Sequence, residues 1–204
     1  MSGRILMLHK PKGYVVTRLK RPDSENSPGT QTVYALLPAE FHDQGWVPVG
    51  RLDKDSSGLL LFTREGPLVY RLQTPGNHQK VYEVWVKGIL AQEHLRHLLD
   101  GVETPLGLLK AAKVEVLGQV GPNSLIRMIL EGGRNRQIRR MFACMRDMKK
   151  NKYFKVLELT RMKIGSVELD VQPGEWRFLS GGETESLLKN LPDLSETKAN
   201  TGKY

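Results

Sequence analysis

The feature that most constrains the fold is a strict two-residue alternation in QKVYEVWVKG, residues 79–88. Its alternate positions divide into two sets, Val81, Glu83, Trp85 and Lys87 in one and Tyr82, Val84 and Val86 in the other. Successive side chains of a β-strand point to opposite faces of a sheet, whereas a helix repeats about every 3.6 residues. The segment is therefore predicted to be a strand with two different faces, which requires a β-sheet in the fold.

Strand-like and helix-like segments occur along the chain in mixed order. Strands are predicted at residues 4–10, 14–19, 45–52, 57–63, 79–88, 108–118, 124–133, 154–165, 166–170 and 175–179. Helices are predicted at residues 32–38, 67–73, 91–101, 135–145 and 184–190. Because this order lacks the regular strand–helix–strand rhythm of a parallel sheet, it predicts an α+β fold with mostly antiparallel pairing.

The chain of 204 residues has a formal net charge of +9, and its basic side chains are concentrated in two segments. Residues 131–163 contain eleven Lys or Arg against three acidic residues, and residues 1–21 contain six against none. Clustered positive charge favours a polyanionic partner, because each phosphate contact releases counterions. The alternative is a solvated basic face, but charge that only keeps a protein in solution has no need to cluster.

The sequence also bears on the cellular compartment. A single cysteine, Cys144, excludes an internal disulfide and a cysteine-based zinc site, which fits a reducing cytoplasm. No segment approaches the length that spans a bilayer, and the N-terminus lacks a long apolar signal. We therefore expect a cytoplasmic protein with no membrane partner.

Residues 193–204 lack an apolar pattern and are predicted to form a disordered tail.

The segment GRLDKDSSGLLLFT, residues 50–63, places a polar loop that contains Asp53 between two predicted strands. The loop matches the start of a calcium-binding loop, but Arg64 stands where such a loop needs a bidentate Glu. The glycine-rich EGGRNRQ lacks the Gly-Lys-Ser/Thr ending of a P-loop, and no histidine pair has the ligands that complete a metal site. What remains is a carboxylate held in a tight loop.

An arginine-rich segment, GGRNRQIRRM, opens a predicted helix. Arg136, Arg139 and Arg140 have three- and four-residue spacings and are expected to share one face of that helix. Arg134 falls where free backbone N–H groups favour an anion. The residues alone leave two classes open. One is an enzyme that acts on nucleic acid with a single aspartate, and the other is a binding module whose arginine helix enters a groove.

The loop GRLDKDSSGLLLFT resembles the signature of the pseudouridine synthases of the RsuA and RluB/E/F group, Gly-Arg-Leu-Asp-x-x-Ser/Thr-x-Gly-Leu-Leu. The matching positions are Gly50, Arg51, Leu52, Asp53, Ser56, Gly58, Leu59 and Leu60. HKPKGYVVT is similar to the family's Lys-Pro-x-Gly element, KVYEVWVKG to its Lys-x-Tyr strand, GRNRQIRRM to its arginine helix and LTRMKIGSVEL to its last strand pair. The resemblance covers residues 4–179.

The resemblance implies a catalytic domain over residues 1–192, in which two subdomains share a mostly antiparallel bent sheet, with flanking helices and an active-site cleft between the subdomains. It implies isomerisation of a uridine in ribosomal RNA, without metal or cofactor. We expect 23S rRNA as the substrate, with 16S rRNA and tRNA as alternatives, no DNA partner and a monomeric enzyme. Because the chain begins at the Lys-Pro-x-Gly region, it is expected to lack the N-terminal S4-like domain, as in the RluE branch.

Roles of single residues also follow from the resemblance. Asp53 corresponds to the catalytic carboxylate, and Tyr82 to the tyrosine that stacks on the target uracil. Arg139 corresponds to the basic residue that pairs with the aspartate, and Ile138 lines the pocket. Arg51 corresponds to the arginine that fills the space left by the flipped uridine. The residues expected to hold phosphates are Arg134, Arg136 and Arg140.

The sequence departs from the family pattern at two places. Gly132 stands where the family usually has a glutamate. Residues 145–153, MRDMKKNKY, replace a short glycine-containing turn, and the added basic charge is expected to contact RNA.

Overall fold

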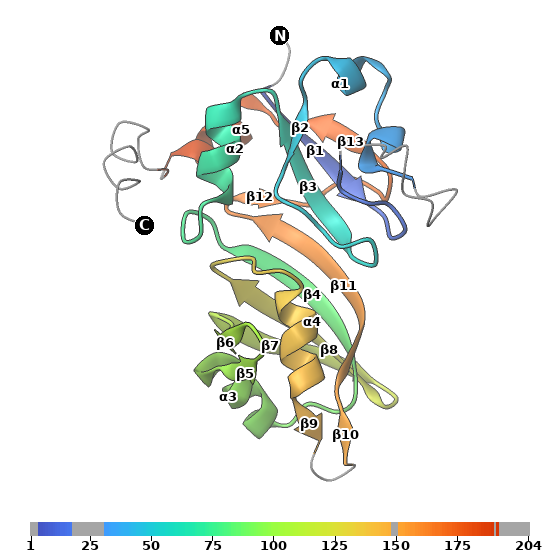
Figure 1. The fold of residues 1–204 in the computed structure, drawn as a ribbon, viewed down its shortest axis with the longest axis vertical. Coiled ribbons are helices and arrows are strands. Elements are labelled where there is room, and N and C mark those ends of the chain that lie inside the picture. Colours follow the sequence, from blue (N-terminus) through green and yellow to red (C-terminus); the bar gives the residue numbers. More distant parts are fainter. Residues whose placement is uncertain (1–3, 18–30, 148–150, 190, 192–204) are drawn as a thin grey trace. The chain divides into compact units, whose positions relative to one another are not determined.

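The structure of the chain is a computed structural model that describes residues 4–17, 31–147, 151–189 and 191. It divides into two compact units. Unit 1 comprises Met1–His78 and Gly165–Tyr204, and unit 2 comprises Gln79–Ile164 (Figure 1). The tail predicted at residues 193–204 lies outside the described residues.

Unit 1 is built around two strands that are buried on both faces. β1 (Ile5–Lys10) pairs antiparallel with β3 (Ser57–Thr63) on one side and with β13 (Trp176–Phe178) on the other. β2 (Val47–Val49) pairs with β3. The other elements of the unit are η1 (Val33–Leu36), α1 (Glu40–Asp43), α2 (Gly66–Gln73), β12 (Val167–Glu168) and α5 (Gly181–Leu188). The unbroken apolar runs of β1 and β3 suit their burial.

An aromatic cluster fills the core on one side of these strands. Phe41 packs edge-to-face against Trp46 and Trp176, with ring centroids 5.5 and 5.0 Å apart. The Tyr34 hydroxyl donates a hydrogen bond of 2.9 Å to the carbonyl of Trp46. Aromatic pairs of this geometry add to the stabilisation that burial provides, so the cluster fixes the hairpin of β2 and β3, which carries the Asp53 loop.

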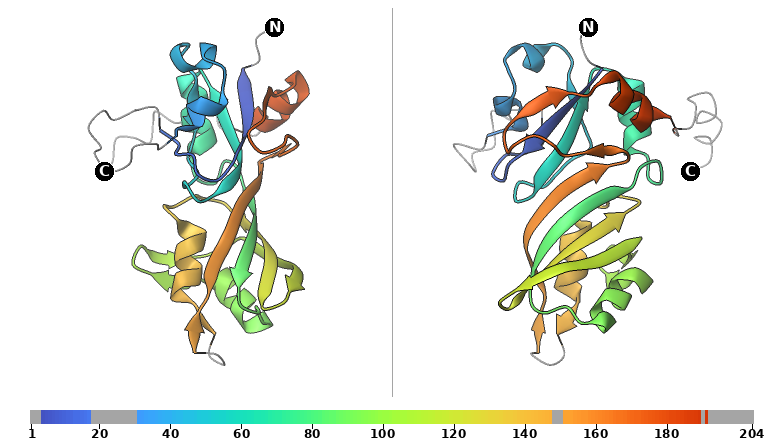
Figure 2. Two further views of the ribbon diagram at one scale, coloured as in Figure 1. Left: turned by 90° about the vertical axis from the view of Figure 1, so that its right-hand side faces the viewer. Right: turned by 180° about the vertical axis from the view of Figure 1, so that it is seen from behind.

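Unit 2 is a four-stranded antiparallel sheet with helices on one face. Its strand order is β11 (Lys155–Ile164), β4 (Lys80–Lys87), β8 (Asn123–Leu130) and β7 (Lys113–Val120). The helices are α3 (Gln92–Asp100) and α4 (Gln137–Cys144), and α4 packs against β11 (Figure 2). Two short hairpins complete the unit, β5 (Val102–Thr104) with β6 (Gly107–Leu109) and β9 (Arg146–Asp147) with β10 (Lys152–Tyr153).

The α+β prediction is confirmed, and the alternation of residues 79–88 is found as β4. The strand predicted at 14–19 is wrong over its described part, where Val15 makes only an isolated bridge to Thr32. Tyr14 and Val16 instead pack against the aromatic cluster, so their apolar character serves the core without a strand ladder. The strand predicted at 108–118 is divided between β6 and β7. The sequence did not predict α1, β5 or the β9–β10 hairpin, because elements of two to four residues are too short to show a period.

A network around Arg177 makes the stability of unit 1 depend on pH. The Arg177 guanidinium donates to both oxygens of Glu183, at 2.9 and 2.6 Å, and to both oxygens of Asp170. Glu183 also accepts a hydrogen bond of 2.7 Å from the backbone of Ser180, the N-cap of α5. These contacts, with Arg177 as the main cause, lower the pKa of Glu183 from 4.5 to about 2.

Because the folded-state pKa of Glu183 is depressed, its contribution to stability is full above about pH 4.5 and is lost as the pH falls toward 2. We expect Glu183→Gln to lower the free energy of unfolding by about 1 kcal/mol at pH 7, since solvent screens this partly exposed pair. Urea denaturation between pH 7 and pH 2.5 measures the difference. It should shrink below pH 4.5, and a difference that stays constant over this range would contradict the assignment.

Candidate active site

The loop that carries Asp53 is a closed turn with a buried anchor on each side. It begins at Gly50, whose φ of 76° lies in the left-handed region that favours glycine. The backbone N–H of Ser56 donates to the carbonyl of Asp53 at 3.0 Å, which closes a four-residue turn. Leu52 before the turn is 7% exposed and Ser56 after it is 1% exposed. The polar loop is therefore a defined structure held by its own backbone.

A buried lysine fixes this turn to the neighbouring strand. Lys10, the last residue of β1, is fully buried, and its ammonium donates to the carbonyl of Ser56 at 2.6 Å and to that of Pro11 at 3.0 Å. A longer contact of 3.4 Å reaches the carbonyl of Lys54. The N–H of Gly13 donates to the same Lys54 carbonyl at 2.8 Å. The Lys-Pro-Lys-Gly turn thus holds the backbone on both sides of Asp55.

Asp53 itself is half-buried, and Arg51 beside it is exposed. A carboxylate on a rigid, partly enclosed turn can act as a nucleophile or stabilise a positively charged sugar intermediate. The turn therefore presents the Asp53 carboxylate partly enclosed, with Arg51 two positions before it in the chain.

Tyr82 lies on the covered face of the unit 2 sheet, the face that bears the buried side chains of β4 and β8. It is 7% exposed. Met128 of β8 is directly opposite it on one side, and Arg161 of β11 on the other. The ring therefore has an apolar neighbour and a cationic neighbour, a setting that suits stacking on a planar base.

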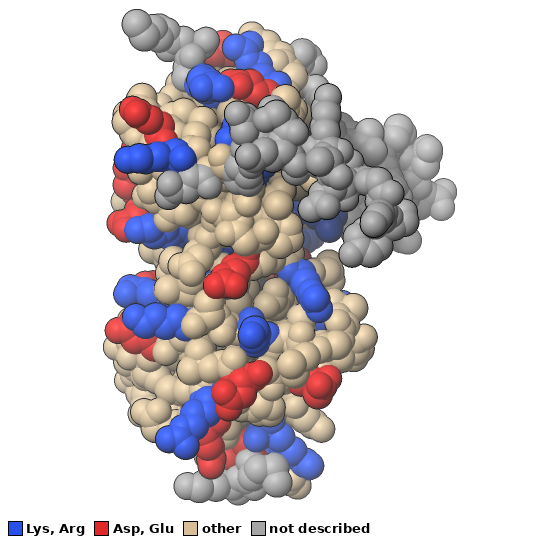
Figure 3. Space-filling view, turned by 90° about the vertical axis from the view of Figure 1, so that its left-hand side faces the viewer, with Lys and Arg blue, Asp and Glu red and all other residues tan. Residues whose placement is uncertain are grey.

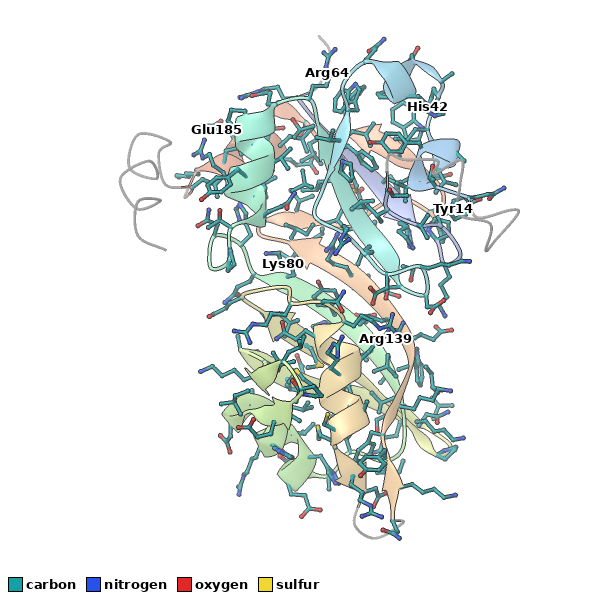
Figure 4. All side chains as sticks on the ribbon, viewed as in Figure 1. Tyr14, His42, Arg64, Lys80, Arg139 and Glu185 are labelled. Carbon is teal, nitrogen blue, oxygen red and sulfur yellow. The ribbon has the colours of Figure 1, made fainter. Side chains whose placement is uncertain are left out.

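Helix α4 supplies Ile138 and Arg139. Ile138 is 3% exposed and belongs to the buried side of the helix with Met141 and Phe142. The Arg139 guanidinium is partly buried and donates to the carbonyl of Val156 at 3.3 Å. Figure 4 places Arg139 at the first turn of α4. A guanidinium held in this way is suited to pairing with a carboxylate or phosphate.

The remaining arginines do not share one helix face as predicted, because α4 begins only at Gln137. Arg136 precedes the helix and has a φ of 49°, a left-handed conformation that few non-glycine residues adopt. Arg140 donates from its side chain to the carbonyl and side-chain oxygens of Asn135, at 3.1 and 3.2 Å. Arg134 donates to the carbonyl of Leu106 at 3.3 Å, which ties the loop to the β5–β6 hairpin.

The eight predicted site residues divide between the units. Asp53 and Arg51 belong to unit 1, and the other six belong to unit 2. Within the described ranges no group of three His, Cys, Asp or Glu residues is arranged to hold a metal ion. His94, one of the histidines at helical spacing, instead accepts a hydrogen bond from the N–H of Ala91 and packs against Phe154.

Sequence reasoning gave no role to Lys10, Lys80 or Arg161, although Lys10 and Lys80 belong to the Lys-Pro-x-Gly and Lys-x-Tyr elements. Burial at Lys10 has no local signal, because its carbonyl partners at Lys54 and Ser56 lie more than forty positions away. Lys80 did have a signal. It occupies the same set of alternate positions in β4 as Tyr82, Val84 and Val86, the set that the structure buries.

The charged side chains of the surface are mixed on the face shown in Figure 3, where basic and acidic residues alternate. On this face the charged side chains therefore form no uniform positive patch. Among the described residues, no helix is both long and apolar enough to cross a membrane.

Comparison with known proteins identifies the family. A family profile described as RNA pseudouridylate synthase matches residues 4–144. Ribosomal large subunit pseudouridine synthase B of Vibrio vulnificus (strain CMCP6) is 33% identical over 194 residues, which are 95% of this chain and 55% of that protein. The chain thus spans about half the length of that relative. The uncharacterized RNA pseudouridine synthase YtzG of Bacillus subtilis (strain 168) is 34% identical over 92% of this chain and 73% of its own length.

Solved structures agree with these relatives. A crystal structure of a pseudouridylate synthase matches 91% of this chain and 74% of its own, with a TM-score of 0.75 and 29% sequence identity. The archaeal box H/ACA sRNP Nop10-Cbf5 complex matches 81% of this chain and 49% of its own, with a TM-score of 0.57 at 20% identity, and supports the fold alone. From its sequence profile, its relatives and its fold, this chain belongs to the RNA pseudouridylate synthase family.

Proposed function

We propose that the chain isomerises a uridine of bacterial 23S ribosomal RNA to pseudouridine, with Asp53 as the catalytic carboxylate. The observation that carries the proposal is the Asp53 turn, a family signature whose backbone is held by a buried lysine. In this reaction the bond between N1 and the ribose C1′ breaks, and C5 of the base then bonds to C1′. The C5 hydrogen leaves as a proton and N1 takes one up, so the reaction consumes no cofactor.

The proposal gives each of the predicted site residues a role. Asp53 attacks the sugar, attacks the base or takes a proton, or it stabilises the charge on the sugar. Arg139 takes the role of the family's basic partner of the aspartate. Tyr82 stacks on the uracil and Ile138 lines the pocket. Arg51 occupies the space that the flipped uridine leaves in the RNA. The residues proposed to hold phosphates are Arg134, Arg136 and Arg140.

The names of the relatives support ribosomal RNA of the large subunit as the substrate. We propose that the protein acts on this substrate in the bacterial cytoplasm, as a monomer. A uridine in a loop or irregular helix is the easiest to extract from its stack, so a short stem-loop should suffice.

Basic side chains at the far end of β4 and in the β9–β10 hairpin offer a second contact with RNA. Lys87 and Lys155 are exposed and directly opposite each other on adjacent strands, where like charges destabilise a sheet unless an anion lies between them. The Tyr153 ring is 62% exposed, and the Arg146 guanidinium lies 5.6 Å from its centroid. Two cations for phosphates and an aromatic ring for a base fit single-stranded RNA.

We expect Tyr153→Ala to weaken RNA binding about tenfold, since stacking contributes about 1–3 kcal/mol per base. The single-turnover rate at saturating RNA should not change, because the ring is proposed to bind and not to react. Filter binding measures the affinity, which should also fall about a hundredfold or more between about 50 and 200 mM salt. Tyr70→Ala is the matched control, because Tyr70 is similarly exposed, at 52%, on α2. Equal affinities of the two variants would refute the contact.

The test of the function is a map of pseudouridines in ribosomal RNA from a bacterial strain that lacks the gene. Loss of one 23S site, restored by the wild-type gene and not by the Asp53→Asn gene, is the expected result. Loss of a site in 16S rRNA or tRNA would identify that RNA as the substrate in place of 23S rRNA. An unchanged map in all three RNAs would refute the proposal.

A further inference from the structure

Lys80 is a half-buried lysine on the face of the unit 2 sheet that also carries Tyr82. It is the first residue of β4 and belongs to the same alternate positions as Tyr82. Leu130 of β8 is directly opposite it on one side and Ile164 of β11 on the other, and both are buried. Figure 4 shows Lys80 at the start of β4, and Arg139 at the first turn of α4 in the same unit.

A second cation lies next to Lys80. Arg161 is 4% exposed and opposes Tyr82 from β11. Burial and, after it, the charge of Arg161 lower the pKa of Lys80 below its usual 10.5. The two cations are therefore close enough to repel each other, with the Tyr82 position beside both.

This arrangement is unfavourable for the folded protein alone. Among the described residues, no hydrogen bond or ion pair of the Lys80 ammonium offsets the partial burial of this side chain. A charge that loses water without gaining a partner destabilises a fold. Groups of this kind are concentrated where a bound ligand or a reaction supplies the missing partner.

The neighbours of Lys80 indicate what kind of anion it receives. Leu130, Ile164 and Met128 are apolar, and Tyr82 offers a ring. Such a surface suits a flat, delocalised anion, whereas a phosphate would lose more hydration there. When the N1–C1′ bond of uridine breaks, the electron pair of that bond stays on the uracil and spreads to its carbonyl oxygens.

We propose that Lys80 is a further catalytic residue of this chain, whose ammonium binds a carbonyl oxygen of the target uracil and stabilises the charge of the departing base. This inference rests on the proposed function. The anion forms when the N1–C1′ bond breaks, and its negative charge is consumed when C5 donates an electron pair to C1′. Proton loss from C5 and proton uptake at N1 complete the isomerisation. Lys80 forms and breaks no covalent bond in these steps. Its positive charge stabilises the uracil anion, and the nearby charge of Arg161 adds to this stabilisation.

The test compares Lys80→Met, which keeps the length of the side chain, with Lys80→Arg, which keeps the charge. We expect Lys80→Met to lower the single-turnover rate of pseudouridine formation about a hundredfold, with RNA affinity within about threefold of wild type. Lys80→Arg should stay within about tenfold of the wild-type rate. Lys113→Met removes an exposed lysine of the same sheet and should have the wild-type rate.

Two further readouts separate a catalytic role from a structural one. Lys80→Met should be at least as stable as wild type in urea, because it removes a half-buried charge. With 5-fluorouridine at the target position, C5 has no proton to lose, so the measured step is cleavage of the N1–C1′ bond. The deficit of Lys80→Met in that cleavage rate should shrink to about tenfold or less, because fluorine stabilises the uracil anion without help from Lys80. Structural damage would give the same deficit with both substrates.

A Lys80→Met rate within threefold of wild type would overturn the inference. So would a rate loss matched by lost stability or by an equal deficit with 5-fluorouridine. If the wild-type chain forms no pseudouridine in any ribosomal RNA or tRNA, the proposed function itself fails, and this result is distinct from an active wild type with an active Lys80→Met variant.

Discussion

Asp53→Asn is expected to reduce pseudouridine formation by at least about a thousandfold while RNA affinity stays within about threefold of wild type. The amide has the shape of the carboxylate, so the turn is retained, because its closing hydrogen bond uses the backbone carbonyl of Asp53. The amide lacks the charge that a nucleophile or an oxocarbenium stabiliser requires. Single-turnover assays with mass-spectrometric detection of pseudouridine measure the rate, and filter binding measures the affinity.

The control for this experiment is Asp55→Asn in the same turn. Asp55 is exposed, and the proposed chemistry gives it no role, so its variant should have a rate within about threefold of wild type. An Asp53→Asn rate within tenfold of wild type would refute the assignment of Asp53. Equal losses in the two variants would point to the turn as a whole and would also contradict it.

Lys10→Met should lower the free energy of unfolding by about 3 kcal/mol, the largest stability effect expected in the chain. The ammonium of Lys10 is fully buried and holds the carbonyls of Ser56 and Pro11 at 2.6 and 3.0 Å. Met fills the same volume but leaves these carbonyls without their charged donor. The destabilisation should be accompanied by lower activity of the remaining folded protein, because the backbone beside Asp53 loses its anchor.

Urea denaturation measures this stability loss, and Lys54→Met is the control. Lys54 lies in the same loop, but its side chain is exposed, so its variant should stay within about 0.5 kcal/mol of wild type. A loss below about 1 kcal/mol for Lys10→Met would show that the ammonium does not hold the turn.

Local periodicity was sufficient to predict the longer elements of the fold. The alternation that contains Tyr82 predicts β4, and the apolar run from Leu59 to Phe62 predicts β3. These segments carry their own signal because each side chain repeats a burial pattern over several positions. The strand expected at 14–19 fails because Tyr14 and Val16 are apolar for a different reason, which is contact with the aromatic cluster.

The candidate site was less accessible to sequence reasoning. Without the family signature, Asp53 is indistinguishable from an ordinary turn residue, and the role proposed for it depends on that signature. The helical spacing of Arg136 and Arg140 suggested a shared face, but the backbone of Arg136 is left-handed and lies before the helix. The contacts of Lys10 depend on strand pairing between distant segments, which no local pattern contains.

The most direct test of the account is the release of tritium from RNA labelled at C5 of uridine. Formation of pseudouridine removes the C5 hydrogen at the modified position and nowhere else. Purified wild-type chain incubated with unmodified 23S rRNA transcript should release tritium to a plateau of one hydrogen per RNA molecule, and Asp53→Asn should release none. Absence of release by the wild type, with both rRNA transcripts and tRNA as substrates, would contradict the account.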